Sequence, residues 1–589
     1  MINYQLKTFE KGDKTTTIGG AVKSLGPLLR DEVRPIVISL VAVIVNSGAN
    51  LLSPFIIAYI IDKYIATKDF HGVLMYSGIL AVIYLLGLVA AYVQTKVMGG
   101  VGRRVLFKLR NRIFTKLQEL PVAFFNANKA GDLISRINSD TDKLNQFFSQ
   151  ALLQFFGNIF LMFGAGAFLL LLNVRLGAAS LAPALIVIVI TQLLSTWINR
   201  TSRTSLQALG GMSAEIQESL ANFKVVVAFN RLDYFRVKFD SANKENYSAS
   251  VKAGVASNIL TPIYGVASNA AQIVMLAYGI VLIASGNLTV GFLIGFLLYV
   301  NNFYTPLRQL ASVWSSLQLA LASLDRISEV LGLGSDIKVI ESGKKAPPSA
   351  AAAVLSFDRV FFSYTDDKEV LRDVSFALEK GKTYALVGPT GGGKTTTASL
   401  MARLYDPSMG TVYLGGRDIR SYEAGERAGK IGFILQEPFL FSGTVGENIL
   451  YGNEEYGSYS NEKLLGVLEA RGLGGLLARF EKGLDTNVGA SDSISLGQKQ
   501  LVAFIRAVLR APELLILDEA TANIDTVTEQ LLEEILRKLP KETTKVIIAH
   551  RLNTIENADD IFFVNAGTVV HAGSFAHALE MLMSGKRAS

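Results

Sequence analysis

The amino-acid sequence predicts two parts of different fold class, an α-helical transmembrane region followed by an α/β domain. The first observation is a series of long uncharged stretches in the N-terminal half. The second is the glycine-rich segment Gly388–Thr395, which stands between an apolar strand pattern and a helix pattern. The third is the aliphatic run Leu514–Leu517, which leads into Asp518 and Glu519. Short strands alternating with helices, as from Val354 onward, are typical of an α/β sheet.

Composition supports this division. Half of the 589 residues are hydrophobic and only 18% are charged, which is more apolar than an average soluble protein. The net charge of +7 does not predict a nucleic-acid partner, because the basic residues lie beside apolar stretches, where anionic lipid headgroups attract them. The absence of cysteine excludes disulfides and thiolate metal sites. Residues 1–34 are polar, so we expect no cleavable signal peptide and insertion from the first spanning helix.

A membrane-spanning helix needs about 20 predominantly apolar residues. The last of the uncharged stretches is long enough for two helices and is divided by the turn-like segment Ser285–Thr289, so six spans are predicted. We expect a cytoplasmic segment at 1–34, a transmembrane domain at 35–333, a linker at 334–353 and a nucleotide-binding domain at 354–589. The uncharged stretches are Pro35–Ile61, Gly72–Thr95, Leu144–Val174, Leu176–Asn199 and Ala253–Leu307.

The basic residues predict the orientation, because positively charged loops stay in the cytoplasm. The loop after the second span and the loop after the fourth are long and basic, whereas the alternate connections are short. Both termini are therefore expected in the cytoplasm, as in a multi-pass protein of the cytoplasmic (inner) membrane. The residues concerned are Arg103, Arg104, Lys108, Arg110, Arg112 and Lys116 in the first loop, and Arg200, Arg203, Arg231, Arg236 and Lys238 in the second.

The two long loops have interrupted helical patterns. Pro121 predicts a break in the first, and Lys224–Val226 follows a polar helical run in the second. Each tip is either a short crosswise helix that transmits force to the nucleotide domain or an ordinary solvated hairpin. No charged residue lies within a predicted span, which argues against an ion pathway. Amides either line a polar passage or hydrogen-bond neighbouring helices; they are Asn46, Asn50, Asn258, Asn269, Gln272, Asn301 and Asn302.

The glycine-rich segment is predicted to bind the phosphates of ATP, because strand, loop and helix follow in the order that such a loop requires. Glycines let backbone N–H groups converge on phosphate oxygens, and the helix N-terminus adds its partial positive charge. Lys394 is expected to contact the β and γ phosphates, and the Thr395 hydroxyl to coordinate Mg²⁺. The predicted ATP-binding residues here are Gly388, Pro389, Thr390, Gly391, Gly392, Gly393, Lys394, Thr395 and Thr396.

Two carboxylates follow the aliphatic run. Asp518 ends a predicted strand and emerges at the carboxyl edge of the sheet, where ligands bind, so we expect it to hold the metal. Glu519 is expected to polarise the attacking water.

The chain resembles half-transporters of the ATP-binding-cassette exporter family, with six spans, two long cytoplasmic loops and one nucleotide domain. The resemblance implies an α/β P-loop NTPase domain with a helical subdomain. It also implies that Tyr364 stacks on adenine and that Gln436 senses Mg²⁺ and contacts the membrane domain. It implies that Asn523 and Asp525 lie in the loop that crosses the dimer interface, and that His550 acts at the γ-phosphate. The first loop, Gly131–Arg136 followed by Asp140 and Thr141, is similar to that of exporters, which favours the force-transmitting interpretation.

Ser495, Leu496, Gly497 and Gln498 resemble the family signature that closes on ATP held by a second chain. Leu496 replaces the first of two usual glycines, and a Cβ restricts backbone angles and crowds a close approach to phosphate. The alternative is drift of little consequence. Related bacterial exporters pair a chain that has intact catalytic residues but an altered signature with one that has the reverse defects. We therefore expect a heterodimer with one hydrolytic and one degenerate site, with a homodimer as the alternative.

The expected function is ATP-driven export or flipping of lipophilic or amphipathic substrates; the alternative is an ATP-gated channel or regulatory subunit, and a soluble cassette ATPase is disfavoured by the six spans. Lys394, Glu519 and His550 are the expected catalytic residues. Aromatic residues of the membrane region suit such a substrate, although packing between helices is a commoner role for them. They are Phe155, Phe156, Phe160, Phe163, Tyr264, Tyr278, Phe292 and Phe296.

Overall fold

The computed structural model describes residues 4–6, 26–335, 337–341, 353–365, 368–436, 438–489, 494–518, 526–548 and 558–584. The chain forms two compact units. The helical unit comprises Thr8–Gln118 and Gly131–Gly332. The sheet unit comprises Met1–Lys7, Glu119–Ala130 and Leu333–Ser589, so three segments far apart in sequence share one packed body.

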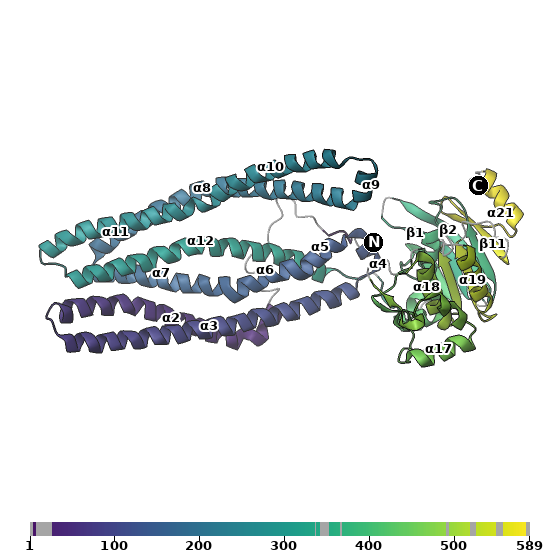
Figure 1. The fold of residues 1–589 in the computed structure, drawn as a ribbon, viewed down its shortest axis with the longest axis horizontal. Coiled ribbons are helices and arrows are strands. Elements are labelled where there is room, and N and C mark those ends of the chain that lie inside the picture. The colour runs from purple at the N-terminus through teal and green to yellow at the C-terminus, as the bar shows by residue number, and fades with distance from the viewer. Residues whose placement is uncertain are drawn as a thin grey trace. The chain divides into compact units, whose positions relative to one another are not determined.

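Six helical segments are long and apolar enough to cross a membrane, as the sequence predicts. They form the extended ribbons of Figure 1. The fifth consists of two consecutive helices, α10 and α11, and the sixth begins directly after the predicted turn at Ser285–Thr289. The main helices are α2 (Val33–Ile60), α3 (Phe70–Gln118), α7 (Leu152–Leu172), α8 (Val174–Ala221), α10 (Leu232–Asn258), α11 (Leu260–Ala284) and α12 (Val290–Gly332).

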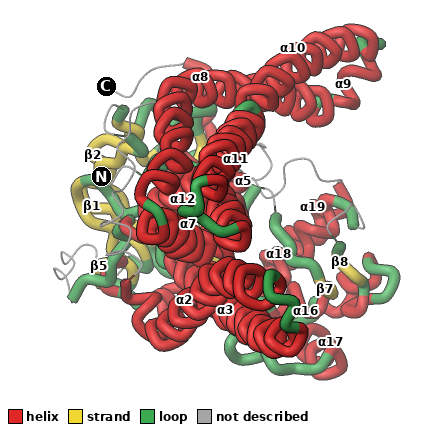
Figure 2. Tube along the Cα trace, turned by 90° about the vertical axis from the view of Figure 1, so that its left-hand side faces the viewer, coloured by secondary structure: helices red, strands yellow, loops and turns green. Residues whose placement is uncertain are grey.

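The helices pack in neighbouring groups: α2 against α3, α7 against α12, and α8 against both α10 and α11 (Figure 2). Buried aromatic residues of α12 hold the centre of this packing. Tyr299 donates a hydrogen bond to the Leu51 carbonyl over 2.6 Å and Tyr304 donates one to the Ser180 carbonyl over 2.9 Å. Tyr264 and Phe296 are also buried, which favours packing over a substrate surface for these two, whereas Phe163 is 68% exposed.

Several amides of the membrane region hydrogen-bond to helices. The side chain of Asn302 donates to the Asn50 carbonyl, and Gln272 donates to the Asn301 side chain. Asn50 and Asn258 each donate to a carbonyl one turn earlier in their own helix. The structure therefore favours helix–helix attachment for Asn302 and Gln272, as is usual for amides in membranes, whereas the amides of Asn50 and Asn258 bond within their own helices.

The first long extension beyond the apolar part of the helices is fastened to α12 by ion pairs. It consists of α5 (Ala130–Ser135), η3 (Arg136–Asp140), α6 (Thr141–Gln146) and η4 (Phe147–Ala151), of which η3 and η4 are π-helical. The Arg136 side chain, 2% exposed, contacts Asp132 over 3.0 Å and Glu329 over 2.8 Å. Asp140, with a fully buried side chain, lies 3.2 Å from Arg326. Breaking one partner of such a buried pair is strongly destabilising, so this extension and α12 should move together.

The two loop tips differ in their surroundings. After α3 ends, Pro121 adopts an extended conformation and α4 (Val122–Ala127) begins, so the predicted break is confirmed. This helix belongs to the sheet unit. The second tip carries α9 (Phe223–Ala228), whose apolar side chains Phe223, Val225 and Val227 are about half exposed.

The sheet unit contains a six-stranded sheet and a four-stranded antiparallel sheet, and this α/β architecture confirms the predicted fold class. The larger sheet has the order β12-β11-β3-β10-β9-β6 and is parallel except for β12. The smaller sheet has the order β2-β1-β4-β5. The strands are β1 (Leu355–Ser363), β2 (Glu369–Leu378), β3 (Thr383–Val387), β4 (Met409–Leu414), β5 (Arg417–Asp418), β6 (Ile431–Ile434), β9 (Leu514–Asp518), β10 (Thr544–Ile548), β11 (Asp560–Asn565) and β12 (Thr568–His571).

Helices complete the sheet unit. Buried leucines and Phe504 form a hydrophobic core shared by α16, α17 and α18, a helical part between β6 and β9 in sequence. A short ladder of β7 (Gly443–Thr444) and β8 (Asn487–Val488) accompanies it. The helices are α14 (Lys394–Met401), α15 (Ala424–Lys430), α16 (Val445–Leu450), α17 (Asn461–Ala470), α18 (Leu496–Leu509), α19 (Thr526–Arg537) and α21 (Phe575–Ser584).

Candidate nucleotide site

The carboxyl ends of the parallel strands gather the candidate residues at one edge of the sheet. In the register, Ile548 of β10 lies opposite Leu386 of β3 on one side and opposite Asp518 of β9 on the other. Because parallel strands end at the same edge, the loop after β3, the carboxylate that ends β9 and the segment after β6 meet there. The sheet topology therefore brings the phosphate loop, Asp518 and Gln436 to one edge, although they are far apart in sequence.

The phosphate loop has the backbone that glycine allows. Gly393 has φ of +115° and immediately precedes α14, which begins at Lys394. Gly388 has φ of +152°, and a Cβ atom there would collide with the carbonyl oxygen of Val564 in β11. The loop thus packs against a neighbouring strand and ends on a helix N-terminus, where the first backbone N–H groups have no partner within the helix. This is the arrangement that phosphate binding requires.

Lys394 is buried in the loop that it terminates. Its side-chain nitrogen donates to the Gly388 carbonyl over 2.8 Å and to the Pro389 carbonyl over 3.1 Å. Thr390, Gly391 and Gly392 lie between these carbonyls and Gly393. These bonds hold the Lys394 ammonium group at the loop, where it can neutralise the charge of a bound phosphate.

Thr395 and Asp518 are brought together from different elements. The Thr395 hydroxyl, in the first turn of α14, donates to the Asp518 carboxylate over 3.4 Å, and Asp518 is only 5% exposed. Hydroxyl and carboxylate oxygens are hard ligands of the kind that Mg²⁺ prefers, so this pair fits the metal. Gln436 follows β6, and its backbone carbonyl accepts from the Gln500 amide of α18 over 3.1 Å.

Tyr364 follows β1 and is fixed beside the phosphate-loop helix. Its hydroxyl lies 3.0 Å from the Thr396 hydroxyl. Its ring meets the rings of Phe362 and Tyr405 edge to face, with centroids 4.8 and 5.2 Å apart. The side chain is nevertheless 45% exposed, which leaves ring surface for stacking.

The residues similar to the family signature begin α18. Ser495 is the N-cap and forms a capping box with Gln498: the Gln498 N–H donates to the Ser495 hydroxyl, and the Ser495 N–H donates to the Gln498 side chain. Leu496 and Gly497 are the first two helical residues. Leu496 has helical backbone angles, and its φ is not positive. The expectation that this position needs the conformational freedom of glycine is therefore wrong; side-chain bulk remains, since Leu496 is 39% exposed.

Four predicted site residues lie outside the residues that the structure describes. They are Glu519, Asn523, Asp525 and His550. Glu519 follows the end of β9 in sequence, and His550 lies two positions beyond the end of β10.

Sequence reasoning missed Tyr405. The Asn126 side chain of α4 donates to the Tyr405 hydroxyl over 2.7 Å, and burial raises the pKa of this phenol. Because the Tyr405 ring also touches Tyr364, this residue connects a loop tip to the predicted adenine site. A lone tyrosine in a turn after α14 carries no sequence signal of such a role.

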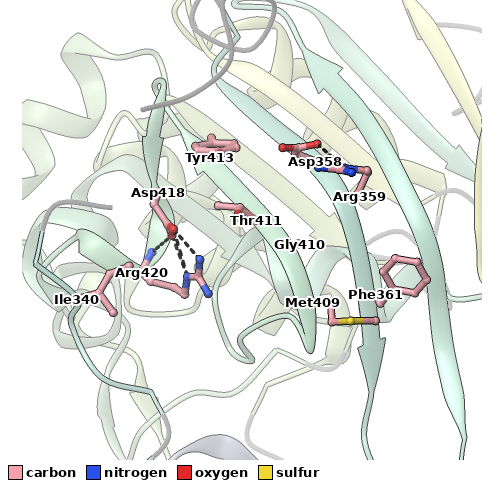
Figure 3. Close-up of a pocket in the computed structure, with 10 residues that line it drawn as sticks. All are labelled: Ile340, Asp358, Arg359, Phe361, Met409, Gly410, Thr411, Tyr413, Asp418 and Arg420. Carbon is pink, nitrogen blue, oxygen red and sulfur yellow. Dashed lines mark hydrogen bonds and ion pairs between the residues drawn. The ribbon is translucent and has the colours of Figure 1, made fainter. Parts of the chain in front are cut away.

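A separate cavity of about 600 Å³ lies on the antiparallel sheet (Figure 3). Asp418 and Arg420 lie side by side in its lining, with their charged groups 2.7 Å apart. None of the lining residues belongs to the predicted ATP site, so this cavity does not explain nucleotide binding. The lining residues are Ile340, Asp358, Arg359, Phe361, Met409, Gly410, Thr411, Tyr413, Asp418 and Arg420.

Comparisons with known proteins agree with this geometry. Residues 36–307 match the model of the ABC transporter transmembrane region, and residues 371–522 match the ABC transporter model. The chain is 31% identical to the ABC transporter ATP-binding protein YknV of Bacillus subtilis, with 91% of this chain and 88% of the relative covered. It is 31% identical to a fatty acid ABC transporter ATP-binding/permease protein of Mycobacterium bovis (87% and 80% covered).

A further relative is a multidrug resistance ABC transporter ATP-binding and permease protein of Lactococcus lactis, 30% identical with 91% of this chain and 90% of the relative covered. Both parts of the chain are therefore accounted for, the apolar helices by the membrane model and the phosphate-loop domain by the ATP-binding model. The chain belongs to the ATP-binding-cassette (ABC) transporter family, as an exporter-type transport ATPase in which a six-helix membrane region and an ATP-binding domain are fused.

Proposed function

We propose that this chain is one half of a dimeric pump that exports or flips lipophilic or amphipathic molecules across the cytoplasmic membrane. The observation that carries the proposal is the meeting of Thr395 and Asp518 at the phosphate loop, in a chain that also has six apolar helices. A site of this kind binds ATP, and binding and hydrolysis of that ATP would drive the movement of the membrane helices. Two of the relatives support an apolar cargo by their names, one as a fatty acid transporter and the other as a multidrug resistance transporter.

The roles of the site residues follow from their positions. Gly388–Thr396 would cradle the phosphates, with Lys394 countering their charge and the Tyr364 ring against adenine. Thr395, Asp518 and Gln436 would hold Mg²⁺, which when bound neutralises charge that develops on the phosphates. Glu519 would orient the attacking water as general base, and His550 would contact the γ-phosphate.

We further propose a heterodimer with unequal sites. Leu496 is the motivating residue: its side chain stands at the N-terminus of α18, where a partner's ATP would approach. Ser495, Gly497 and Gln498 would still present the helix N-terminus to that ATP. The second candidate is a homodimer with two equivalent sites, and it is favoured by the helical backbone of Leu496, which accommodates a Cβ without strain.

Exposed apolar surface on both units supports dimerisation. On the sheet unit, Phe439, Phe441 and Tyr451 are 66%, 41% and 54% exposed. The Phe441 ring lies between the other two, with its centroid 5.2 Å from that of Phe439 and 4.2 Å from that of Tyr451. On the helical unit, α9 presents half-exposed Phe223 and Val225. We propose that α9 of one chain docks on this aromatic patch of the other and carries force between them.

The basic loops favour an orientation with both termini and the ATP-binding domain in the cytoplasm. Asn523 and Asp525 would then lie between the two ATP-binding domains of the dimer.

The test is ATP hydrolysis by the complex, purified with its natural partner and reconstituted in lipid. We expect vanadate-sensitive hydrolysis that rises with lipophilic substrates and accumulation of such a substrate inside inside-out vesicles. Nucleotide-gated ionic current without accumulation would instead identify a channel. Purification of a functional complex that contains only this chain, with equal hydrolysis at both sites, would contradict the heterodimer. Lys394→Ala in the same complex provides the inactive control.

A further inference from the structure

The segment Tyr4–Leu6 is buried against residues far from it in sequence. Tyr4 is 5% exposed and Leu6 is 8% exposed, whereas Gln5 between them is exposed. This alternation is that of an extended strand with one face packed. The segment belongs to the sheet unit, as does α4.

Asn128, at the C-terminal end of α4, recognises the backbone of this segment. Its side-chain nitrogen donates to the Tyr4 carbonyl over 2.8 Å, and its side-chain oxygen accepts from the Leu6 N–H over 3.0 Å. The same nitrogen donates to the Phe124 carbonyl over 2.7 Å, which closes the last turn of α4. One amide thus uses both donors and an acceptor to join helix and segment, as a neighbouring strand would.

The Tyr4 side chain makes two further attachments. Its ring meets the Phe124 ring edge to face, with centroids 6.5 Å apart, and Phe124 is fully buried. Its hydroxyl donates to the Gly334 carbonyl over 3.3 Å. Tyr4 therefore holds α4 and the beginning of the connector in one place.

The other side of α4 leads to the predicted adenine site. Asn126 donates to the Tyr405 hydroxyl, and the Tyr405 ring supports Tyr364. A cavity of about 360 Å³ is lined by Tyr4 together with Pro121, Tyr364 and Tyr405. The segment, the helix and the two tyrosines therefore surround one space.

We propose that Tyr4–Leu6 is a positioning element of the ATPase, which docks on Asn128 and Phe124 and so sets how α4 holds Tyr405 beside Tyr364. The proposal rests on the proposed role of Tyr364 at adenine. Because coupling between two binding events is reciprocal, docking of the segment must favour ATP binding by the same factor by which ATP favours docking.

The absence of cysteine from the chain allows a direct test of docking. Single variants Leu6→Cys and Gln5→Cys, each in the full chain with its partner in lipid, are labelled with a water-soluble maleimide. We expect slow labelling of Leu6→Cys and fast labelling of Gln5→Cys. Adding Asn128→Asp, which replaces a donor by an acceptor facing two carbonyls, should accelerate Leu6→Cys labelling on the order of tenfold and leave Gln5→Cys unchanged. ATP without Mg²⁺ should slow Leu6→Cys labelling.

A second measurement separates positioning from a merely structural role. Asn128→Asp alone should raise the ATP concentration for half-maximal hydrolysis by several-fold, on the order of the labelling change, with a smaller change in the maximal rate. Tyr4→Phe, which loses the hydroxyl that bonds to the Gly334 carbonyl, should show a weaker shift in the same direction. A fall in maximal rate with unchanged half-saturation would overturn positioning.

The two proposals fail differently. Equal labelling of Leu6→Cys and Gln5→Cys in a complex that hydrolyses ATP would refute docking of the segment. Labelling that contrasts as expected but ignores both ATP and Asn128→Asp would refute the coupling. A parent complex that neither binds nor hydrolyses ATP would refute the proposed function, whatever the labelling contrast.

Discussion

Substitutions at Leu496 separate backbone conformation from side-chain bulk in the signature. Leu496 is the first residue of α18 and is 39% exposed, so about six-tenths of it is buried, and full burial of a leucine is worth about 1.5–3 kcal/mol. Leu496→Ala should therefore destabilise the sheet unit by about 1–2 kcal/mol. Leu496→Gly should cost at most about 1 kcal/mol more through helix propensity. The Ser495–Gln498 capping box should survive in both variants.

The effect on turnover follows from the same geometry. If the leucine side chain crowds a partner's ATP, Ala and Gly should relieve closure of that site equally. Total turnover should then rise by at most about twofold, a limit reached only where the partner keeps its own catalytic carboxylate at that site. The assay is ATP hydrolysis by the lipid-reconstituted complex, with Leu496→Met as a control of similar volume. An increase with Gly but not with Ala would refute the reasoning, because it would place the requirement in the backbone angles. No change in either variant would favour tolerated drift.

Three further predictions concern the ATP site. Glu519→Gln should retain ATP binding and lower turnover by roughly 10²–10⁴-fold; turnover close to that of the parent, measured at saturating ATP, would exclude Glu519 as the general base. Gly388→Ala should abolish nucleotide binding because its Cβ meets the Val564 carbonyl, whereas Gly391→Ala, which has φ of +79° but open space, should cost about 1–2 kcal/mol and keep measurable binding. Tyr405→Phe should raise the ATP concentration for half-maximal hydrolysis by less than about tenfold, as expected for the loss of one hydrogen bond. An unchanged concentration would argue that the Asn126–Tyr405 bond does not influence ATP binding.

Local chemistry explains why much of this site was predictable. The glycines, the lysine and the threonine of the phosphate loop lie within one continuous segment, so their spacing in the sequence is enough to predict the loop. Asp518 could be placed because an aliphatic strand must end at a sheet edge. Tyr405 could not be placed, because its partners Asn126 and Tyr364 are distant in sequence.

The case of Leu496 shows the opposite limit. Its departure from the family pattern was visible in the sequence, but the backbone reason for concern was wrong, since the residue lies in a helical conformation. A glycine in the family pattern does not by itself indicate positive φ. The local backbone shows whether glycine is needed for its conformational freedom or for the space that its missing side chain leaves.

The sequence by itself determined the six apolar helices, the break at Pro121, the α/β domain and the phosphate loop, because length, hydrophobicity and glycine spacing act over short stretches of chain. Only the tertiary structure decided that α4 and the segment Tyr4–Leu6 pack within the sheet unit and that Asn126 meets Tyr405. It also decided that Arg136 is buried between Asp132 and Glu329. Apart from Arg136–Asp132, which are one helical turn apart, these contacts join residues separated by more than a hundred positions. Their partners are selected by packing and hydrogen-bond satisfaction in three dimensions rather than by any pattern along the chain.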